Sequence, residues 1–181
     1  MQDPDKDISH VVALLTTSAH PGAHKAAVER FFTSDAGLKH PLCVVTRGPN
    51  SRCEILGAYQ WYRILSPRAV VEVKEIVYNR RKNVLFLEVV QRFRVRWSPF
   101  PPIPARSIVR LDLEERDGLH YIVLEEDLFH PVDVAALVIP PLKPFVSLAL
   151  RASNFVHYIG AGIAQNVGVW KPEPVRTTVT A

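Results

Sequence analysis

The segment Val84–Trp97 (VLFLEVVQRFRVRW) limits the folds open to this chain more than any other part of the sequence. Side chains alternate between the two faces of a strand, and one face here carries Leu85, Leu87, Val89, Gln91, Phe93, Val95 and Trp97. The other face is apolar in its first half and ends in Arg92, Arg94 and Arg96. We therefore predict one long strand, covered on both faces at its start and solvated on one face at its end. Because strands average only about 5–6 residues, this length is typical of a strongly bent sheet into which helices pack.

The flanking sequence predicts the rest of one α+β domain. Apolar residues at helical spacing indicate helices over residues 8–16 and 21–32. A third helix is predicted to begin at Ser51-Arg52-Cys53-Glu54, which has the pattern of a capping box. After Pro67 the pattern changes to strands over residues 69–78, 84–97, 105–114 and 119–128, whereas residues 33–41 have the composition of a loop. We predict three N-terminal helices packed in a strongly bent antiparallel sheet over residues 7–131. A helical segment over 132–170 and a flexible tail over 171–181 complete the expected chain.

Composition excludes several classes of protein. The chain has 181 residues and a net charge of +4, which is weakly basic for a dedicated nucleic-acid binder. Strand alternation also separates the arginines from Phe93 and Trp97, which would have to stack on bases, so we expect no nucleic-acid partner. The two cysteines, Cys43 and Cys53, have no metal-binding spacing, and no cofactor motif occurs. We expect no metal, no cofactor and a cytoplasmic location, with membrane association as an addition to it.

The arginine row is expected to lie on a solvated face of the sheet. Acidic residues on neighbouring strands, such as Glu72 and Asp112, would pair with these arginines. The same face is where we expect a homodimer to form.

Three segments resemble one known family. VERFFTSDAGLKHP and GAYQWYRILSP look like the helix-to-loop passage and the third helix of the cone-shaped nuclear-transport-factor-two-like fold. EEDLFHPVDVAALVIP looks like the last strand and exit of a narrower family, the SigF-like proteins of fungi. The resemblance implies a conical α+β domain with an internal pocket. It carries over no chemistry, because the wider fold includes isomerases, dehydratases, hydrolases and binding proteins.

Candidate residues for such a pocket fall into two groups. Aromatic residues on or near the second and third helices, Phe31, Tyr59, Trp61 and Tyr62, are expected to contact a ligand. The candidates for acid–base work are His40, Asp127 and His130. The alternative is that Tyr59 and Tyr62 are ordinary core aromatics, and that Asp127 and His130 only hold the exit of the last strand.

Two hypotheses for function follow from this pocket. The first is a non-catalytic protein that binds a small apolar molecule, such as a lipid or a terpenoid. The second is an isomerase or dehydratase that acts on a similar molecule. Strict alternation places Asp127 on one face with Tyr121, Val123 and Glu125, so we expect that face to be wet, which argues against the enzyme.

The C-terminal part predicts a membrane contact through residues 138–170. Its apolar residues repeat at helical spacing, but Ser153, Asn154 and three glycines make it a poor membrane span. An amphipathic helix in a membrane interface, a lid over the cone and a partner-binding helix are the alternatives that remain. For the membrane alternative, the contacting residues are Lys143 and Arg151 at the headgroups and Phe145, Val146 and Phe155 toward the acyl chains.

Overall fold

The computed structural model describes residues 1–18 and 20–169 and divides the chain into two compact units. The first unit is Met1–Lys143 and the second is Pro144–Ala181. In chain order, the elements of the first unit are α1 (Pro4–Thr17), α2 (Pro21–Phe31), β1 (Phe32–His40), β2 (Cys43–Val45), α3 (Ser51–Leu65), β3 (Val70–Asn79), β4 (Val84–Arg92), β5 (Pro104–Arg116), β6 (Leu119–Phe129), α4 (Pro131–Val138) and the 3-10 turn η1 (Pro140–Leu142). The expected tail over 171–181 lies outside the described residues.

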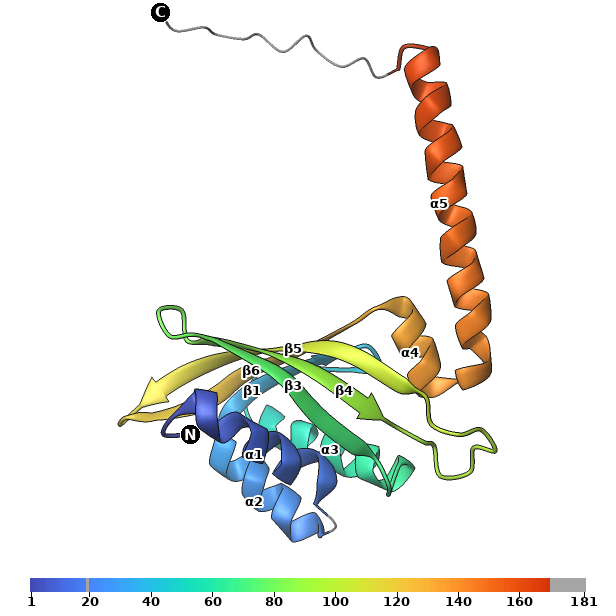
Figure 1. Cartoon of the computed structure of the whole chain (residues 1–181). Helices are drawn as coiled ribbons and strands as arrows, with labels where there is room; N and C mark the ends of the chain where they lie inside the picture. Colours follow the sequence, from blue (N-terminus) through green and yellow to red (C-terminus); the bar gives the residue numbers. More distant parts are fainter. Residues whose placement is uncertain (19, 170–181) are drawn as a thin grey trace, which may run out of the picture. The chain divides into compact units, whose positions relative to one another are not determined.

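A six-stranded sheet in the order β2-β1-β6-β5-β4-β3 forms the body of the first unit. Neighbouring strands are antiparallel except for β1 and β6, which pair in parallel. The sheet is curved, and α1, α2 and α3 lie together against its inner face (Figure 1). The predicted α+β class, the bent sheet and the three N-terminal helices are confirmed.

The long strand predicted over residues 84–97 ends at Arg92. Pro104 is paired with Arg92 at the start of β5, so beyond this pair β4 has no strand beside it on that edge. The backbone then bonds to the end of α3 instead: the Arg94 amide donates to Ser66 Oγ at 3.0 Å, and the Arg96 amide donates to the Leu65 carbonyl at 2.7 Å. The prediction was wrong by five residues because side-chain alternation continued past the end of strand pairing.

The loop predicted over residues 33–41 is strand β1. Its Ser, Asp and Gly residues favour a turn locally, but pairing with β6 on one side and β2 on the other determines its conformation. Gly37 permits the close approach of these neighbours. A Cβ there would lie 2.9 Å from Arg47 Cγ and 3.1 Å from Leu124 Cδ1.

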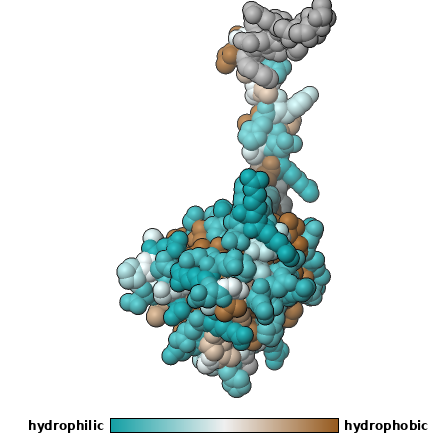
Figure 2. All heavy atoms as spheres, turned by 90° about the vertical axis from the view of Figure 1, so that its left-hand side faces the viewer, coloured by the Kyte–Doolittle hydropathy of each residue, from teal (hydrophilic) through white to brown (hydrophobic). Residues whose placement is uncertain are grey.

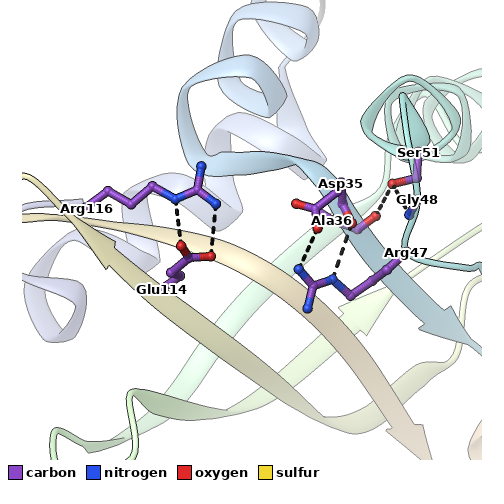
Figure 3. A network of polar contacts seen from close by, with 7 residues as sticks. All are labelled: Asp35, Ala36, Arg47, Gly48, Ser51, Glu114 and Arg116. Carbon is purple, nitrogen blue, oxygen red and sulfur yellow. Dashed lines mark hydrogen bonds and ion pairs between the residues drawn. The ribbon is translucent and has the colours of Figure 1, made fainter.

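A polar network fixes the start of α3 to β1 (Figure 3). Ser51 Oγ donates to the carbonyl of Ala36 at 2.6 Å, and Arg47 pairs with the Asp35 carboxylate at 2.6 Å. The helix does begin at Ser51, but Asn50 is its N-cap residue and forms no side-chain cap bond. The predicted capping box is therefore wrong, because the Ser51 hydroxyl is used in a tertiary contact. This contact fixes the position from which α3 directs Tyr59 and Tyr62 into the cone.

The two faces of the sheet differ in character. On the inner face Leu85, Leu87 and Val89 are buried in the main core. The outer face carries ion pairs, in which Arg106 pairs with Glu88, Arg110 with Asp112 and Glu126, and Arg92 with Glu72. Glu72 and Asp112 pair as expected, whereas Arg94 and Arg96 of the arginine row lie beyond the end of β4. The start of β4 was expected to be covered on both faces, but Phe86 on the outer face is 38% exposed. The side of the first unit that faces the viewer in Figure 2 is mostly hydrophilic, with apolar side chains in small separate patches.

The C-terminal segment divides between the two units. Helix α4 packs against β5, and its Leu137 is buried in a small cluster with Ala69, Phe93 and Ala105. Helix α5 (Lys143–Asn166) makes up most of the described part of the second unit. Among residues 1–18 and 20–169, no helix has both the length and the apolar character needed to cross a bilayer.

Candidate functional site

A cavity of about 280 Å³ lies within the first unit, lined by α1, α3 and the inner face of the sheet. Most of its wall is aliphatic: Ile8, Val11, Val12, Leu15, Leu38, Leu42, Ala58, Leu65, Val71, Leu87, Val89, Val109, Leu111, Ile122 and Leu137. Of the described residues that line it, none is a lysine or an arginine. The volume is close to the lower end of the range for small-molecule sites, about 300–1,000 Å³.

One side of the cavity is open to solvent. Three of the lining residues are themselves exposed: Leu42 and Cys43 at the β1–β2 turn, and Trp61 on α3. Trp61 is 59% exposed, so its indole belongs to the rim of the opening rather than to the interior. An apolar molecule entering the cone would contact this rim first.

Tyr59 and Glu125 form the central polar contact of the cavity. The Tyr59 hydroxyl donates to the Glu125 carboxyl group and lies 2.8 Å from each of its oxygens. Burial raises the pKa of Glu125 to about 7, although the Tyr59 hydrogen bond acts in the opposite direction. Burial also raises the pKa of Tyr59 well above its usual value, so the phenol keeps its proton and remains the donor.

Asp127 lines the same cavity two residues farther along β6. Its side chain is half-buried and has no hydrogen-bond or ion-pair partner among residues 1–18 and 20–169. Burial, and then the nearby charge of Glu125, raise the pKa of Asp127 well above its usual value. Because no described residue pairs with this half-buried carboxyl group, its proton or its lone pairs are available to a molecule in the cavity.

A β-bulge explains why both carboxyls point inward. In the pairing of β5 with β6, Asp112 is opposite Leu124 and Leu113 is opposite Ile122, so Val123 is left without a partner. The extra residue changes which positions face the core: Ile122 faces inward before the bulge, and Glu125 and Asp127 do so after it. The expectation that Asp127 lies on a wet face is therefore wrong, because it assumed unbroken alternation through Val123.

The remaining polar groups of the cavity come from α3, β4 and β1. The Tyr62 hydroxyl donates to Gln91 Oε1 at 3.2 Å, and its ring lies 4.9 Å from the ring of Phe93. His40 Nδ1 accepts a hydrogen bond from the Leu42 amide at 3.1 Å. Burial lowers the pKa of His40, which favours a neutral imidazole in the wall.

The structure separates the other residues expected at the site. Phe31 is buried in the main core and is not among the cavity-lining residues. His130 is exposed and caps α4, where its Nδ1 accepts from the Val132 amide at 3.4 Å; this is the capping role given as the alternative. Asp127, a candidate for acid–base work, does line the cavity, and the alternative role given to it with His130 at the strand exit is not found. Within the described residues, no three potential ligands gather as a metal site.

Sequence reasoning missed two residues of the cavity, Glu125 and Gln91, as site residues. Gln91 is a single polar residue on the apolar face of β4, and that pattern alone could have indicated it. Glu125 had no such signal, since a bulge cannot be read from alternation.

The comparisons with known proteins agree with this architecture. A family model described as the SigF NTF2-like domain matches residues 1–169. The chain belongs to this family. No curated protein matches the chain.

Solved structures place the family domain among cone-shaped folds. A protein from Catenulispora acidiphila with a ketosteroid isomerase-like fold, in complex with trimethylamine, is 17% identical, with a TM-score of 0.55 over 74% of this chain and 92% of that one. An NTF2-like protein of unknown function from an Exiguobacterium species is 9% identical, with a TM-score of 0.56 over 70% and 99%. A putative SnoaL-like polyketide cyclase from a Jannaschia species is 13% identical, with a TM-score of 0.53 over 75% and 93%. At these identities the likeness shows the fold alone.

Proposed function

We propose that this SigF NTF2-like domain binds a small, largely apolar molecule, such as a lipid fragment or a terpenoid, inside its cone. The observation that carries the proposal is the cavity itself: about 280 Å³, mainly aliphatic, and open beside Trp61. Few polar groups interrupt its wall, which is the usual composition of a site that binds by burial and orients by a few hydrogen bonds.

The polar groups favour a ligand that carries one oxygen. Tyr59 is already bonded to Glu125 and Tyr62 to Gln91, whereas Asp127 has no partner in the described part of the chain. With its raised pKa, Asp127 is protonated over a wider pH range than an exposed aspartate and can donate to a hydroxyl or carbonyl oxygen.

Farnesol, an apolar alcohol, is a suitable probe for this proposal. We expect it to raise the unfolding temperature of the purified chain in a concentration-dependent way, because a ligand of the native state stabilises that state. Val89→Phe, which fills part of the cavity, should weaken farnesol binding by about tenfold or more. Val90→Phe is the matched control, since the neighbouring Val90 lies on the outer face opposite Glu72 and Arg106. Equal affinities of the two variants, or no binding to the parent chain, would contradict the proposal.

A second candidate function, an isomerase or dehydratase, is favoured by the carboxyl pair in the cavity. Burial gives Asp127 and Glu125 raised pKa values, and a base is effective when its pKa is near the working pH. In an isomerisation, the Asp127 carboxylate would remove a proton from one carbon of the ligand and return it to another, so that no atom is gained or lost.

Turnover distinguishes the two candidates. Small molecules that co-purify with the full chain would be identified by mass spectrometry and incubated with fresh protein. Catalysis predicts conversion that falls by about 10²–10⁴-fold in Asp127→Asn, the usual contribution of an acid–base group. Glu126→Gln is the control, because Glu126 is on the outer face and pairs with Lys39 and Arg110. A ligand that is bound but unchanged over hours would support binding without catalysis.

A further inference from the structure

Helix α5 has a continuous apolar face. With about 100° between successive residues, an arc of roughly 120° contains Asn166, at the C-terminal end of the helix, and eight apolar residues. These residues, called the apolar arc below, are Phe145, Leu148, Ala149, Ala152, Phe155, Val156, Ile159 and Ile163. Lys143, Asn154 and Gln165 lie on the opposite side of the helix, and Arg151 lies beside the arc, about 40° beyond Phe155. Val146, expected from the sequence to contact a membrane, is about 100° from Phe145 and outside the arc.

The apolar arc is uncovered. No residue of α5 is buried, and Phe145, Leu148 and Phe155 are each more than 60% exposed. Both polar and apolar side chains reach the surface along the helix (Figure 2). A contiguous apolar surface of this kind marks a contact with another molecule or with a membrane.

The charges of α5 favour an anionic membrane as its partner. After Asp133 the next acidic residue in the sequence is Glu173, so α5 carries Lys143 and Arg151 and no acidic residue. A purely cationic polar face is complementary to anionic lipid headgroups, and it opposes parallel packing against a second copy of itself.

We propose that α5 lies flat in the interface of an anionic membrane, with the apolar arc toward the acyl chains. Its 24 residues correspond to a helix of about 36 Å. This orientation places Lys143 and Arg151 on the side of the headgroups. The proposal is independent of what fills the cavity of the first unit.

The connection between β4 and β5 has exposed aromatic and cationic side chains that would form a second contact with an anionic membrane. Because β4 ends at Arg92, Trp97 lies outside the sheet and is 71% exposed, and Phe100 beside it is 45% exposed. Arg94 and Arg96 are exposed and form no ion pair with any residue that the structure describes. Aromatic and cationic side chains together are typical of residues that anchor at the membrane–water boundary.

Two leucines of α5 provide a matched test. Leu148 is within the apolar arc, whereas Leu150, two residues along, is on the polar side, and both side chains are exposed. The full chain, Leu148→Gln and Leu150→Gln would be floated with vesicles of equal parts phosphatidylserine and phosphatidylcholine, and with phosphatidylcholine alone. Circular dichroism of each variant verifies that the helix is retained.

The proposal predicts a specific order of partition coefficients. The parent chain should float with the anionic vesicles, less with the neutral ones, and less as salt is added. Leu148→Gln should lower the partition coefficient by about tenfold, and Leu150→Gln by much less. Trp97→Ser should lower it several-fold; an unchanged value would remove the loop from the proposal.

Other outcomes would overturn the membrane contact of α5. These are a parent chain that does not float, equal loss in the two leucine variants, and preference for neutral vesicles. An oligomer that Leu148→Gln dissociates in the absence of lipid would instead identify the apolar arc as a surface for a partner helix.

Discussion

Two carboxyl side chains in an apolar cavity make Glu125 and Asp127 the least ordinary residues of this domain. Burial disfavours their charged forms, and Tyr59 compensates only Glu125 with a hydrogen bond. A core selected only for stability would place apolar residues at these positions, since burying a polar group without a full set of hydrogen bonds costs free energy. Their presence in the cavity supports the proposed ligand site.

The raised pKa of Glu125 predicts how stability depends on pH. Between its ordinary value of 4.5 and about 7, the folded chain holds a proton that the unfolded chain has lost. The free energy of unfolding should therefore fall as pH rises through this window and level off above it, by about 1–3 kcal/mol in total. The pKa of Asp127 is raised by burial in the same direction, so this group adds to the fall.

Urea unfolding at pH 5, 6, 7 and 8 would measure this slope. Glu125→Gln combined with Asp127→Asn removes both titrating groups and keeps an acceptor for Tyr59, so the slope should flatten and stability at pH 8 should rise. Glu115→Gln, at an exposed acid outside the cavity, should leave the slope in place. A slope that persists in the double variant would show that Glu125 and Asp127 are not the source of the pH dependence.

At the scale of single residues, sequence reasoning identified only part of the candidate site. Helical periodicity placed Tyr59 and Tyr62 on one face of α3, and both line the cavity. The inward direction of Glu125 and Asp127 depends on the bulge at Val123, which is a property of strand pairing and not of the local sequence.

Among the elements, strand β1 depends on a close approach between Gly37 and its neighbours Arg47 and Leu124. Gly37 is opposite Leu124 in the parallel pair, and a Cβ at Gly37 would be 2.9 Å from Arg47 Cγ. Gly37→Ala should therefore destabilise the fold by about 1–3 kcal/mol. Because β1 also carries Leu38 and His40, this variant should weaken ligand binding as well.

Gly57 in α3 offers the matched control for that substitution. A Cβ there meets nothing within 4 Å, so Gly57→Ala should stabilise the helix by about 0.5–1 kcal/mol. Urea midpoints of the two variants would be compared with that of the parent chain. Shifts of the same sign would show that the space around Gly37 does not determine the outcome.

The elements with strong periodicity were predictable, and those that depend on distant partners were not. The helices and β3, β5 and β6 follow from apolar spacing and turn residues. Strand β1 has the composition of a loop and exists because β6 and β2 pair with it. For β4, the apolar pattern predicted which side chains face inward but not where the strand ends. Its C-terminal end depends on the pairing of Arg92 with Pro104 at the start of β5.

For the whole molecule, the outer face of the sheet is the expected surface for a homodimer. Phe86 and Ile108 on neighbouring strands are exposed there among the ion pairs. We expect sedimentation velocity to show a dimer that grows with concentration and that Phe86→Glu weakens. Arg80→Glu, in the turn after β3, is a control of similar exposure. A monomer at all concentrations would contradict this expectation.

The division into two units predicts that the first unit folds without α5. The two apolar clusters of the domain, and the partly buried residues packed on them, come from residues 1–138. A chain ending at Lys143 should therefore unfold within about 3 °C of the parent, which corresponds to less than about 1 kcal/mol for a domain of this size. It should bind farnesol with the affinity of the parent, because every cavity-lining residue is retained. Vesicle flotation should be lost or strongly reduced in the same chain. A larger drop in the unfolding temperature would mean that α5 packs on the domain, and unchanged flotation would assign the membrane contact to the first unit alone.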